Sequence, residues 1–78
     1  MPQSGNEKKT QKAVLATKLI ELKEDVTEKD RKEAIVELDL TKVTIGNYLN
    51  GNVNDNDTAV RIIKFFTKCI EKRYKAIA

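Results

Sequence analysis

The sequence contains no histidine, no tryptophan and a single cysteine, Cys69. One cysteine cannot form a disulfide within the chain, and a zinc site built from cysteine and histidine is excluded. Catalytic triads and acid–base pairs that depend on an imidazole are excluded as well. Because Cys69 lies among apolar residues with no neighbouring base, we expect it to pack as a small hydrophobic residue. We therefore expect that the protein is not an enzyme and binds no cofactor. Residue counts leave one catalytic alternative open, which is a pair of carboxylates.

Long apolar runs are also missing. No segment approaches the roughly 18–20 apolar residues that span a bilayer. The first ten residues are polar and lack the apolar segment of a signal peptide. These absences predict a cytoplasmic protein with no membrane partner. The two Tyr and two Phe are few, so the core must consist mainly of Leu, Ile, Val and Ala, which suits short packed helices.

The 78 residues are enough for one small domain, and 40% hydrophobic with 35% charged residues is a globular composition. The net charge of +3 is unevenly distributed. Residues 21–39 carry eight acids and four bases, whereas residues 59–78 carry six bases and one acid. A basic end suggests an anionic partner, and a solvated lysine-rich helix face is the alternative.

Apolar residues recur at helical spacing along most of the chain, which predicts an all-α fold. We expect four helices near residues 11–25, 28–38, 42–49 and 58–76. Residues 1–10 are expected to form a flexible polar tail ahead of a domain that covers residues 11–78. The last helix should turn Tyr74 inward. The residues expected to be largely buried are Leu15, Leu19, Leu22, Ala34, Leu38, Leu40, Ile45, Ile62, Ile63 and Phe66.

Capping residues support these boundaries. The segment 27–30 (Thr-Glu-Lys-Asp) resembles a capping box with Asp at its last position. Thr10 and Thr41 are expected to cap the first and third helices, and Asn56 or Asp57 the fourth. The third helix has the weakest composition, because Val43 to Ile45 are β-branched and a mid-helix Gly costs about 1 kcal/mol relative to Ala. Residues 40–45 could alternate as a strand, but no matching strand lies nearby.

The segment from Arg31 to Asn50 predicts a helix, a three-residue turn and a second helix that cross at a steep angle. The residues expected to face inward are Ala34, Leu38, Leu40, Ile45 and either Tyr48 or Leu49. This leaves Lys42, Val43, Thr44 and Asn47 at the exposed start and outer face of the second helix. Such positions enter the DNA major groove in helix-turn-helix proteins.

Residues 39–51 (Asp-Leu-Thr-Lys-Val-Thr-Ile-Gly-Asn-Tyr-Leu-Asn-Gly) resemble the turn and recognition helix of the phage lambda repressor and Cro family. They are also similar to the lactose-repressor headpiece. The matching residues are Thr41, Ile45, Asn50 and Gly51, and residues 58–63 resemble the helix that follows, so the resemblance covers about residues 11–70. Two departures are Asp39 where the turn usually has Gly, and Ile35 where a small residue is expected.

The resemblance implies a small four-helix, lambda-repressor-like helix-turn-helix domain. It further implies a phage or bacterial transcriptional regulator of repressor type that binds double-stranded DNA sequence-specifically. Lys42 can then donate to guanine or to phosphate, Asn47 can pair with adenine or reach the backbone, and Val43 can contact a thymine methyl. The residues expected at the sugar-phosphate backbone are Thr41, Thr44, Asn50, Asn52 and Asn54. Lys8, Lys9 and Lys12 form either an arm along the duplex or a solubilising tail.

The alternative is a protein-interaction or structural module on the same fold, without DNA readout. The acidic second helix and the single cation of the third favour it. Val60 and Phe65 could then be exposed contact residues, or else lie under the first helix in an ordinary core. We also expect a homodimer through the last helix, where Phe65 and Ile77 are spare apolar residues, and no small-molecule substrate.

Overall fold

The computed structural model describes the backbone of residues 4–77 and the side chains of residues 11–76. These residues form four helices and no strand: α1 (Ser4–Lys23), α2 (Glu28–Leu38), α3 (Lys42–Leu49) and α4 (Asn56–Ile77). The prediction of an all-α fold is confirmed, with α2 and α3 at the expected residues. Residues 43–46 are helical, so the strand alternative is wrong. No helix in this part of the chain is long and apolar enough to cross a membrane.

The first helix begins earlier than predicted. α1 starts at Ser4 rather than near residue 11, and it ends at Lys23 rather than 25. Residues 4–10, which we expected in a polar tail, therefore continue the helix, and Thr10 does not cap it. The physical reason is that Glu7, Lys8 and Lys9 are good helix formers, so this polar segment can extend a helix whose second half is packed against the core. Residues 1–3 of the predicted tail lie outside the described residues.

Side-chain caps define the starts of the other helices. Thr27 Oγ1 accepts a hydrogen bond from the Asp30 amide (3.1 Å), and the Asp30 carboxylate accepts one from the Thr27 amide (3.2 Å), so the predicted capping box is confirmed. Thr41 caps α3 as predicted. The cap of α4 is Asp55 rather than Asn56 or Asp57, because the Asp55 carboxylate accepts hydrogen bonds from the amide and the hydroxyl of Thr58 (3.0 and 2.7 Å).

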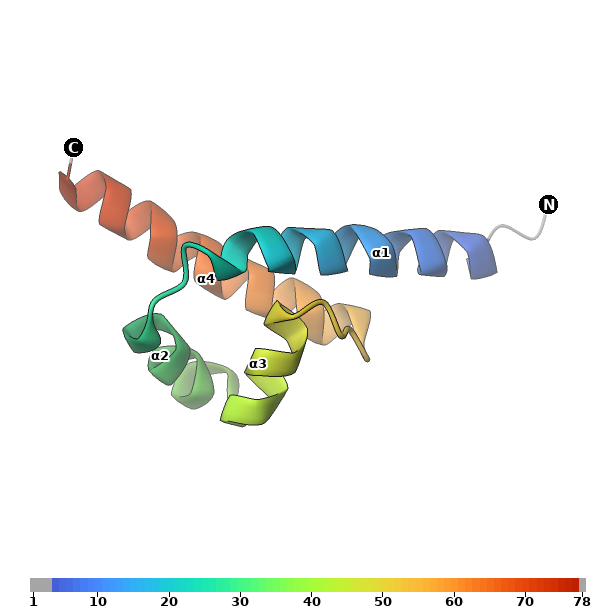
Figure 1. Ribbon diagram of the computed structural model, residues 1–78, viewed down its shortest axis with the longest axis horizontal. Coiled ribbons are helices and arrows are strands. Elements are labelled where there is room, and N and C mark those ends of the chain that lie inside the picture. Colours follow the sequence, from blue (N-terminus) through green and yellow to red (C-terminus); the bar gives the residue numbers. More distant parts are fainter. Residues whose placement is uncertain (1–3, 78) are drawn as a thin grey trace.

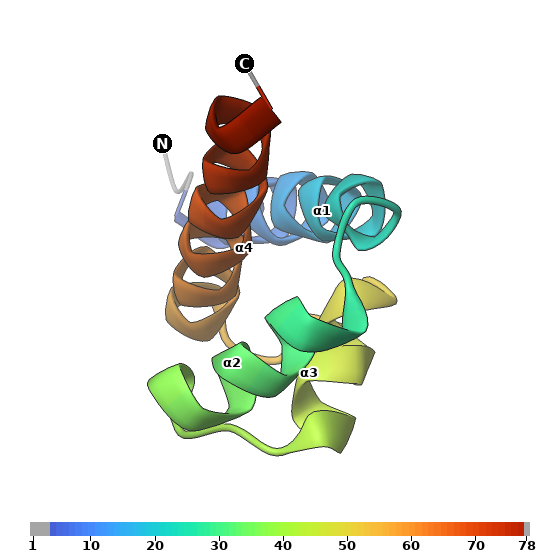
Figure 2. The same cartoon turned by 90° about the vertical axis from the view of Figure 1, so that its left-hand side faces the viewer.

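The four helices enclose the core in a ring. α1 packs on α4 and α3, and α2 also packs on α4 and α3, so each helix contacts two others. Figure 1 shows α1 and α4 crossing along one side, with α2 and α3 below them. Seen from the end, α2 and α3 form the lower half of the molecule, and the last turns of α4 project away from it (Figure 2). The amino-terminal part of α1 projects in the other direction (Figure 1).

Nine hydrophobic residues are buried in the core. They are Leu19, Ala34, Ile45, Tyr48, Leu49, Val53, Ala59, Ile62 and Phe66. Five of the predicted core residues are among them. Leu15, Leu38, Leu40 and Ile63 pack against this core while partly exposed, and Leu22 is half-buried.

The core also differs from the prediction in three further respects. Tyr48 and Leu49 are both buried, although we expected only one of them to face inward. Val53 is buried in the connection that we expected to be a polar loop. The prediction that Tyr74 faces inward is wrong, because 62% of its surface is exposed. The last turns of α4, which include Tyr74, project away from the rest of the molecule (Figure 2), so this side chain lies largely in solvent.

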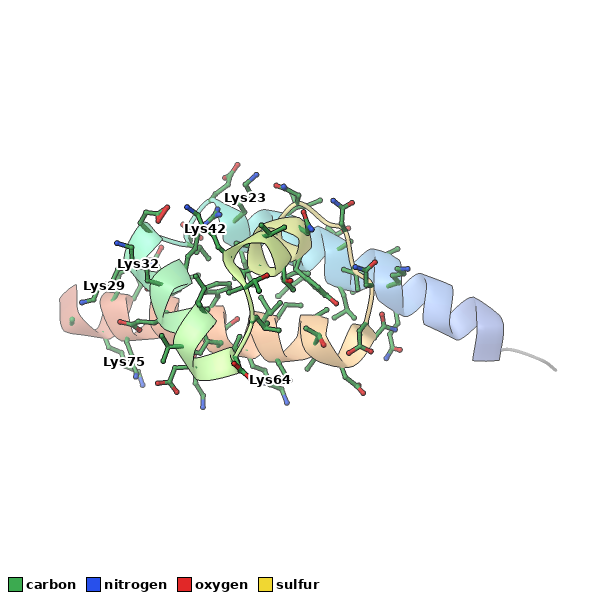
Figure 3. The ribbon with its side chains drawn as sticks, turned by 90° about the horizontal axis from the view of Figure 1, so that it is seen from below. Lys23, Lys29, Lys32, Lys42, Lys64 and Lys75 are labelled. Atoms are coloured by element: carbon green, nitrogen blue, oxygen red, sulfur yellow. The ribbon has the colours of Figure 1, made fainter. Side chains whose placement is uncertain are left out.

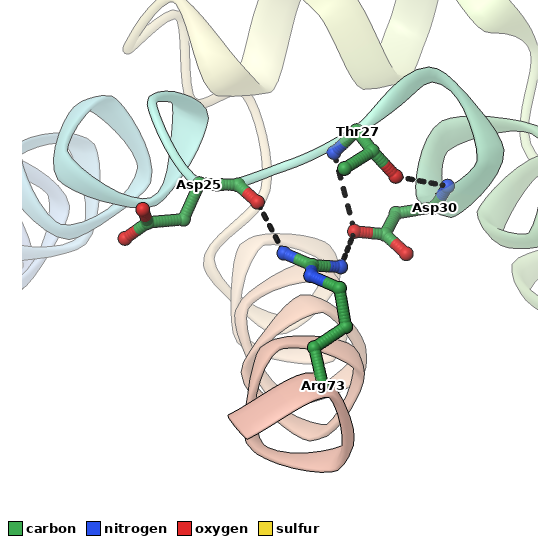
Figure 4. Close-up of polar contacts among 4 residues, drawn as sticks. All are labelled: Asp25, Thr27, Asp30 and Arg73. Atoms are coloured by element: carbon green, nitrogen blue, oxygen red, sulfur yellow. Dashed lines mark hydrogen bonds and ion pairs between the residues drawn. The ribbon is translucent and has the colours of Figure 1, made fainter. Parts of the chain in front are cut away.

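A polar junction ties α4 to the α1–α2 connection. The Arg73 guanidinium donates to the Asp30 carboxylate and to the backbone carbonyl of Asp25 (Figure 4). Burial opposes ionisation of Asp30, but the Thr27 amide and Arg73 outweigh it, so the pKa of Asp30 lies below its ordinary value. Asp30 is thus both the capping-box acid of α2 and the partner of α4.

Candidate nucleic-acid interface

The α2–α3 connection is three residues long and its conformation is determined by Asp39 and Thr41. Asp39 adopts the left-handed conformation (φ 55°, ψ 48°), which Asp tolerates better than most residues. Its amide donates to the Ile35 carbonyl in the last helical bond, and its left-handed conformation then ends α2. Leu40 turns toward the core, and the Thr41 hydroxyl accepts a hydrogen bond from the Thr44 amide (3.1 Å) at the start of α3. Asp39 can therefore replace the Gly that is usual in this kind of turn.

α2 and α3 cross through buried residues of both helices. Ala34 of α2 is fully buried, and Ile45 and Tyr48 of α3 are almost fully buried. Ile35, which stands where a small residue was expected, is only half-buried and packs against the edge of the core. The small residue at the centre of the core is therefore Ala34, which makes room for α3 without requiring a small side chain at residue 35.

The outer face of α3 presents most of the predicted contact residues. Lys42, Val43 and Asn47 are exposed, with Val43 at 71%. Positions 43 and 47 are one helical turn apart and point in nearly the same direction. Thr44 is half-buried at the edge of this face. The structure thus brings these four predicted residues together on one short helix.

The two threonine hydroxyls have a role within the fold. Thr41 Oγ1 accepts from the Thr44 amide and donates to Thr44 Oγ1 (2.8 Å). Both residues lie at the first turn of α3, where the backbone amides of the helix also point outward. Thr41 is exposed, so its hydroxyl can donate to a phosphate in place of Thr44 Oγ1 while its oxygen keeps the capping bond from the Thr44 amide.

The end of α3 contains a contact that the sequence did not indicate. Lys23 Nζ at the end of α1 donates to Asn50 Oδ1 (2.6 Å). Asn50 was predicted to reach the DNA backbone, and the structure adds an ammonium group beside it. Asn52 and Asn54 are exposed in the connection that follows. No local pattern could have indicated the Lys23–Asn50 pair, because 27 residues separate its members.

The cations are arranged unevenly around the molecule. Figure 3 shows Lys23, Lys42, Lys32 and Lys29 along one edge, whereas Lys64 and Lys75 lie along the opposite edge. The two arginines of α4 serve the fold: Arg61 donates to the Leu38 carbonyl at the end of α2 (3.2 Å), and Arg73 binds Asp30. The basic carboxyl-terminal segment is therefore not an extension of the α3 face.

Of the predicted amino-terminal arm, only the Lys12 side chain lies within the described residues, and it is exposed. The side chains of Lys8 and Lys9 lie outside them.

Phe65 does not form the exposed apolar contact considered from the sequence. Its ring packs edge-to-face on Phe66 with centroids 5.7 Å apart, and it lies against the core. Val60 is half-buried. Phe65 therefore follows the alternative of an ordinary core. Large apolar side chains that are well exposed lie elsewhere, at Val14, Ile20, Val36 (78%), Val43 and Tyr74.

A cleft of about 220 Å³ lies between the start of α2 and α4, and Glu33, Cys69 and Lys72 line part of it. Burial, together with the nearby carboxylates of Asp30 and Glu33, raises the pKa of the Cys69 thiol. The protonated thiol is a poor nucleophile. Within residues 11–76 no buried side-chain polar atom lacks a hydrogen-bond partner.

No protein-family model matches the chain, and comparisons with curated proteins and with solved structures also give no match. The resemblance to the lambda repressor and Cro family therefore depends on the sequence alone, chiefly on residues 39–51 and 58–63.

Proposed function

We propose that the protein binds double-stranded DNA by placing α3 in the major groove, with the α2–α3 segment acting as a lambda-repressor-like helix-turn-helix. The observation that carries the proposal is the division of α3 into two faces. Ile45, Tyr48 and Leu49 are buried, while Lys42, Val43 and Asn47 are exposed. The outer face of α3 thus combines an apolar side chain, a cation and an amide, which are groups that can contact thymine methyls, phosphates and base edges.

The size and chemistry of this face suit a groove. An α-helix with its side chains is 10–12 Å across, and the major groove is about 12 Å wide. The methyl groups of Val43 can pack on a thymine methyl, and the amide of Asn47 can form hydrogen bonds with an adenine. The ammonium group of Lys42 can bind guanine or phosphate. The proposed role is a transcriptional regulator of repressor type, in which two domains can read two half-sites one helical turn apart.

The acids of α2 do not all oppose this binding mode. Glu33 lines the cleft toward α4, and Glu37 lies one helical turn further along the same row of α2. Lys32 is exposed along the same edge as Lys42 (Figure 3). Part of the negative charge of α2 therefore faces away from α3, while Lys32, a cation of α2, lies on the same edge as Lys42 of α3.

The test is a fluorescence-anisotropy titration of duplex DNA against the wild-type protein and Lys42→Ala and Asn47→Ala variants. Both residues are exposed, so each substitution should change the unfolding free energy by no more than about 0.5 kcal/mol. Each should weaken binding to a selected duplex by about 1–3 kcal/mol. Lys64→Ala on the opposite edge is the matched control and should have a much smaller effect. A double variant that keeps full affinity at physiological salt would exclude α3 from the interface.

A protein-interaction module is the second candidate, and one observation favours it. Val36 of α2 is 78% exposed, although α2 does not enter the groove in the proposed binding mode. If an apolar partner surface covers Val36, then Val36→Glu should abolish association with that partner and leave DNA binding unchanged. Sedimentation of the wild-type and Val36→Glu proteins tests whether the partner is a second copy of the chain.

A further inference from the structure

Gly46 in the middle of α3 is a residue that the fold does not require. A Cβ atom built at this position meets nothing within 4 Å, so no neighbour demands the absence of a side chain. Gly51, by contrast, has φ +94°, and a Cβ there would lie 2.9 Å from Ile20 Cδ1. Glycine is among the poorest helix formers, so Gly46 weakens an eight-residue helix with no packing benefit.

Gly46 lies between two positively charged side chains on the surface. Residues 42, 46 and 50 follow one another at intervals of four and form one row along α3. Lys42 begins this row, and Asn50 ends it about 12 Å further along the helix axis. Lys23 Nζ is bound to Asn50 Oδ1 (2.6 Å), and Figure 3 shows Lys23 and Lys42 on the same edge. This row therefore has no side chain at its middle residue, Gly46, and an ammonium group near each end. We call the surface between Lys42 and Asn50 the notch.

We propose that one sugar-phosphate strand of the duplex lies in this notch, directly against the α3 backbone at Gly46 and between Lys42 and Lys23. This inference rests on the proposed DNA binding through α3. Positions 43 and 47 point most directly away from the core, so Lys42 and Gly46 lie on the flank of that row. When Val43 and Asn47 face the base edges, this flank faces a wall of the groove, which consists of phosphates.

The notch also explains how short side chains reach the bases. Val43 and Asn47 extend only a few ångströms from the backbone, so α3 must lie deep in the groove for them to contact base edges. A side chain at residue 46 would hold the helix away from the strand that it flanks. In this binding mode Lys42 contacts phosphate rather than guanine. The sequence allowed both roles for Lys42, and the notch favours the phosphate contact.

The experiment compares Gly46→Ala and Gly46→Leu with wild type in thermal unfolding and in duplex binding across salt concentrations. Gly46→Ala should raise the Tm, because the added methyl group has space and improves helix propensity. It should nevertheless weaken binding several-fold, and Gly46→Leu should weaken it more than tenfold. Thr17→Ala, at an exposed position of α1, is the control for helix propensity and should leave binding unchanged.

Lysine variants test the two ends of the notch. Lys23→Ala and Lys42→Ala should each lower affinity evenly across duplex sequences and reduce the slope of log K against log salt by about one. Lys64→Ala, on the opposite edge, should reduce this slope by less than Lys23→Ala or Lys42→Ala does.

The outcomes separate the two proposals. A wild-type protein that fails to bind any duplex at low salt overturns the proposed function and the notch with it. If wild type binds but Gly46→Leu and Lys23→Ala bind equally well, only the notch is overturned. A change of base preference in Lys42→Ala, without a change of salt slope, overturns the phosphate contact.

Discussion

Ile62 of α4 is fully buried at the centre of the helix ring, in the same cluster as Ala34 and Phe66. Replacing it with alanine removes apolar contacts and leaves a cavity, so Ile62→Ala should lower the unfolding free energy by about 2–4 kcal/mol. Leu38→Ala should cost less than Ile62→Ala, because Leu38 is half-buried.

Val36→Ala is the control for this prediction, since 78% of Val36 is exposed. It should change stability by no more than about 0.5 kcal/mol. Urea unfolding of the three variants provides the measurement. Equal losses for Ile62→Ala and Val36→Ala would contradict the burial pattern of the helices.

Single residues also show how far the sequence predicted the interface. The helical period alone placed Lys42, Val43 and Asn47 outward and Ile45 inward, because side-chain direction within one short helix depends on spacing. The contact between Lys23 and Asn50 depends instead on how α1 lies against α3, which no local pattern encodes. Val53 is a similar case: its neighbours are polar, and its burial follows from the path of the loop over the core.

At the scale of elements, α3 is the helix with the least intrinsic stability. It has eight residues, with three β-branched residues and a glycine, so its capping residue matters more than in a longer helix. Thr41→Ala removes the hydroxyl that accepts from the Thr44 amide and should cost about 1 kcal/mol. Thr41→Ser keeps this hydroxyl and should cost much less. Denaturant unfolding of both variants is the test, and equal losses would mean that the hydroxyl does not cap α3.

Element boundaries were predicted well where a side-chain cap marks them. α2 and α3 begin directly after Thr27 and Thr41, whose hydroxyls form the expected bonds. The start of α1 has no such marker in the sequence. Its first residues are polar, and polar residues of this kind occur in helices and in tails alike, so they did not indicate where α1 begins. Around the start of α4 the polar run contains four residues able to cap a helix (Asn54, Asp55, Asn56 and Asp57), and composition alone could not identify Asp55.

At the scale of the whole molecule, dimer formation through α4 stays a prediction with less support than the sequence suggested. Phe65 packs against the core, and the Ile77 side chain lies outside the described residues. The last turns of α4 do project from the helix ring with Tyr74 exposed (Figure 2). A second copy of the chain would have to pack on these turns, beside Lys72 and Lys75.

The junction of Arg73 with Asp30 and the Asp25 carbonyl links α4 to α2 and to the α1–α2 connection (Figure 4). This junction makes stability depend on pH. Because the folded pKa of Asp30 lies below the ordinary aspartate value of 3.8, its contribution is complete above that value. The contribution is lost as the pH falls through the lower, folded pKa. Wild-type unfolding free energy should therefore fall as the medium is acidified from pH 5 to about pH 2.

Asp30→Asn separates this effect from general acid denaturation. At neutral pH it should lower stability by about 1 kcal/mol, a modest loss because the Arg73 side chain is 39% exposed to screening solvent. Below pH 4 its stability should decline less steeply than that of wild type, since residue 30 no longer titrates. Some slope must remain, because hydrogen bonds from the Thr58 hydroxyl and amide also lower the pKa of Asp55. Parallel pH profiles of wild type and Asp30→Asn would show that the carboxylate of Asp30 does not hold the helices together.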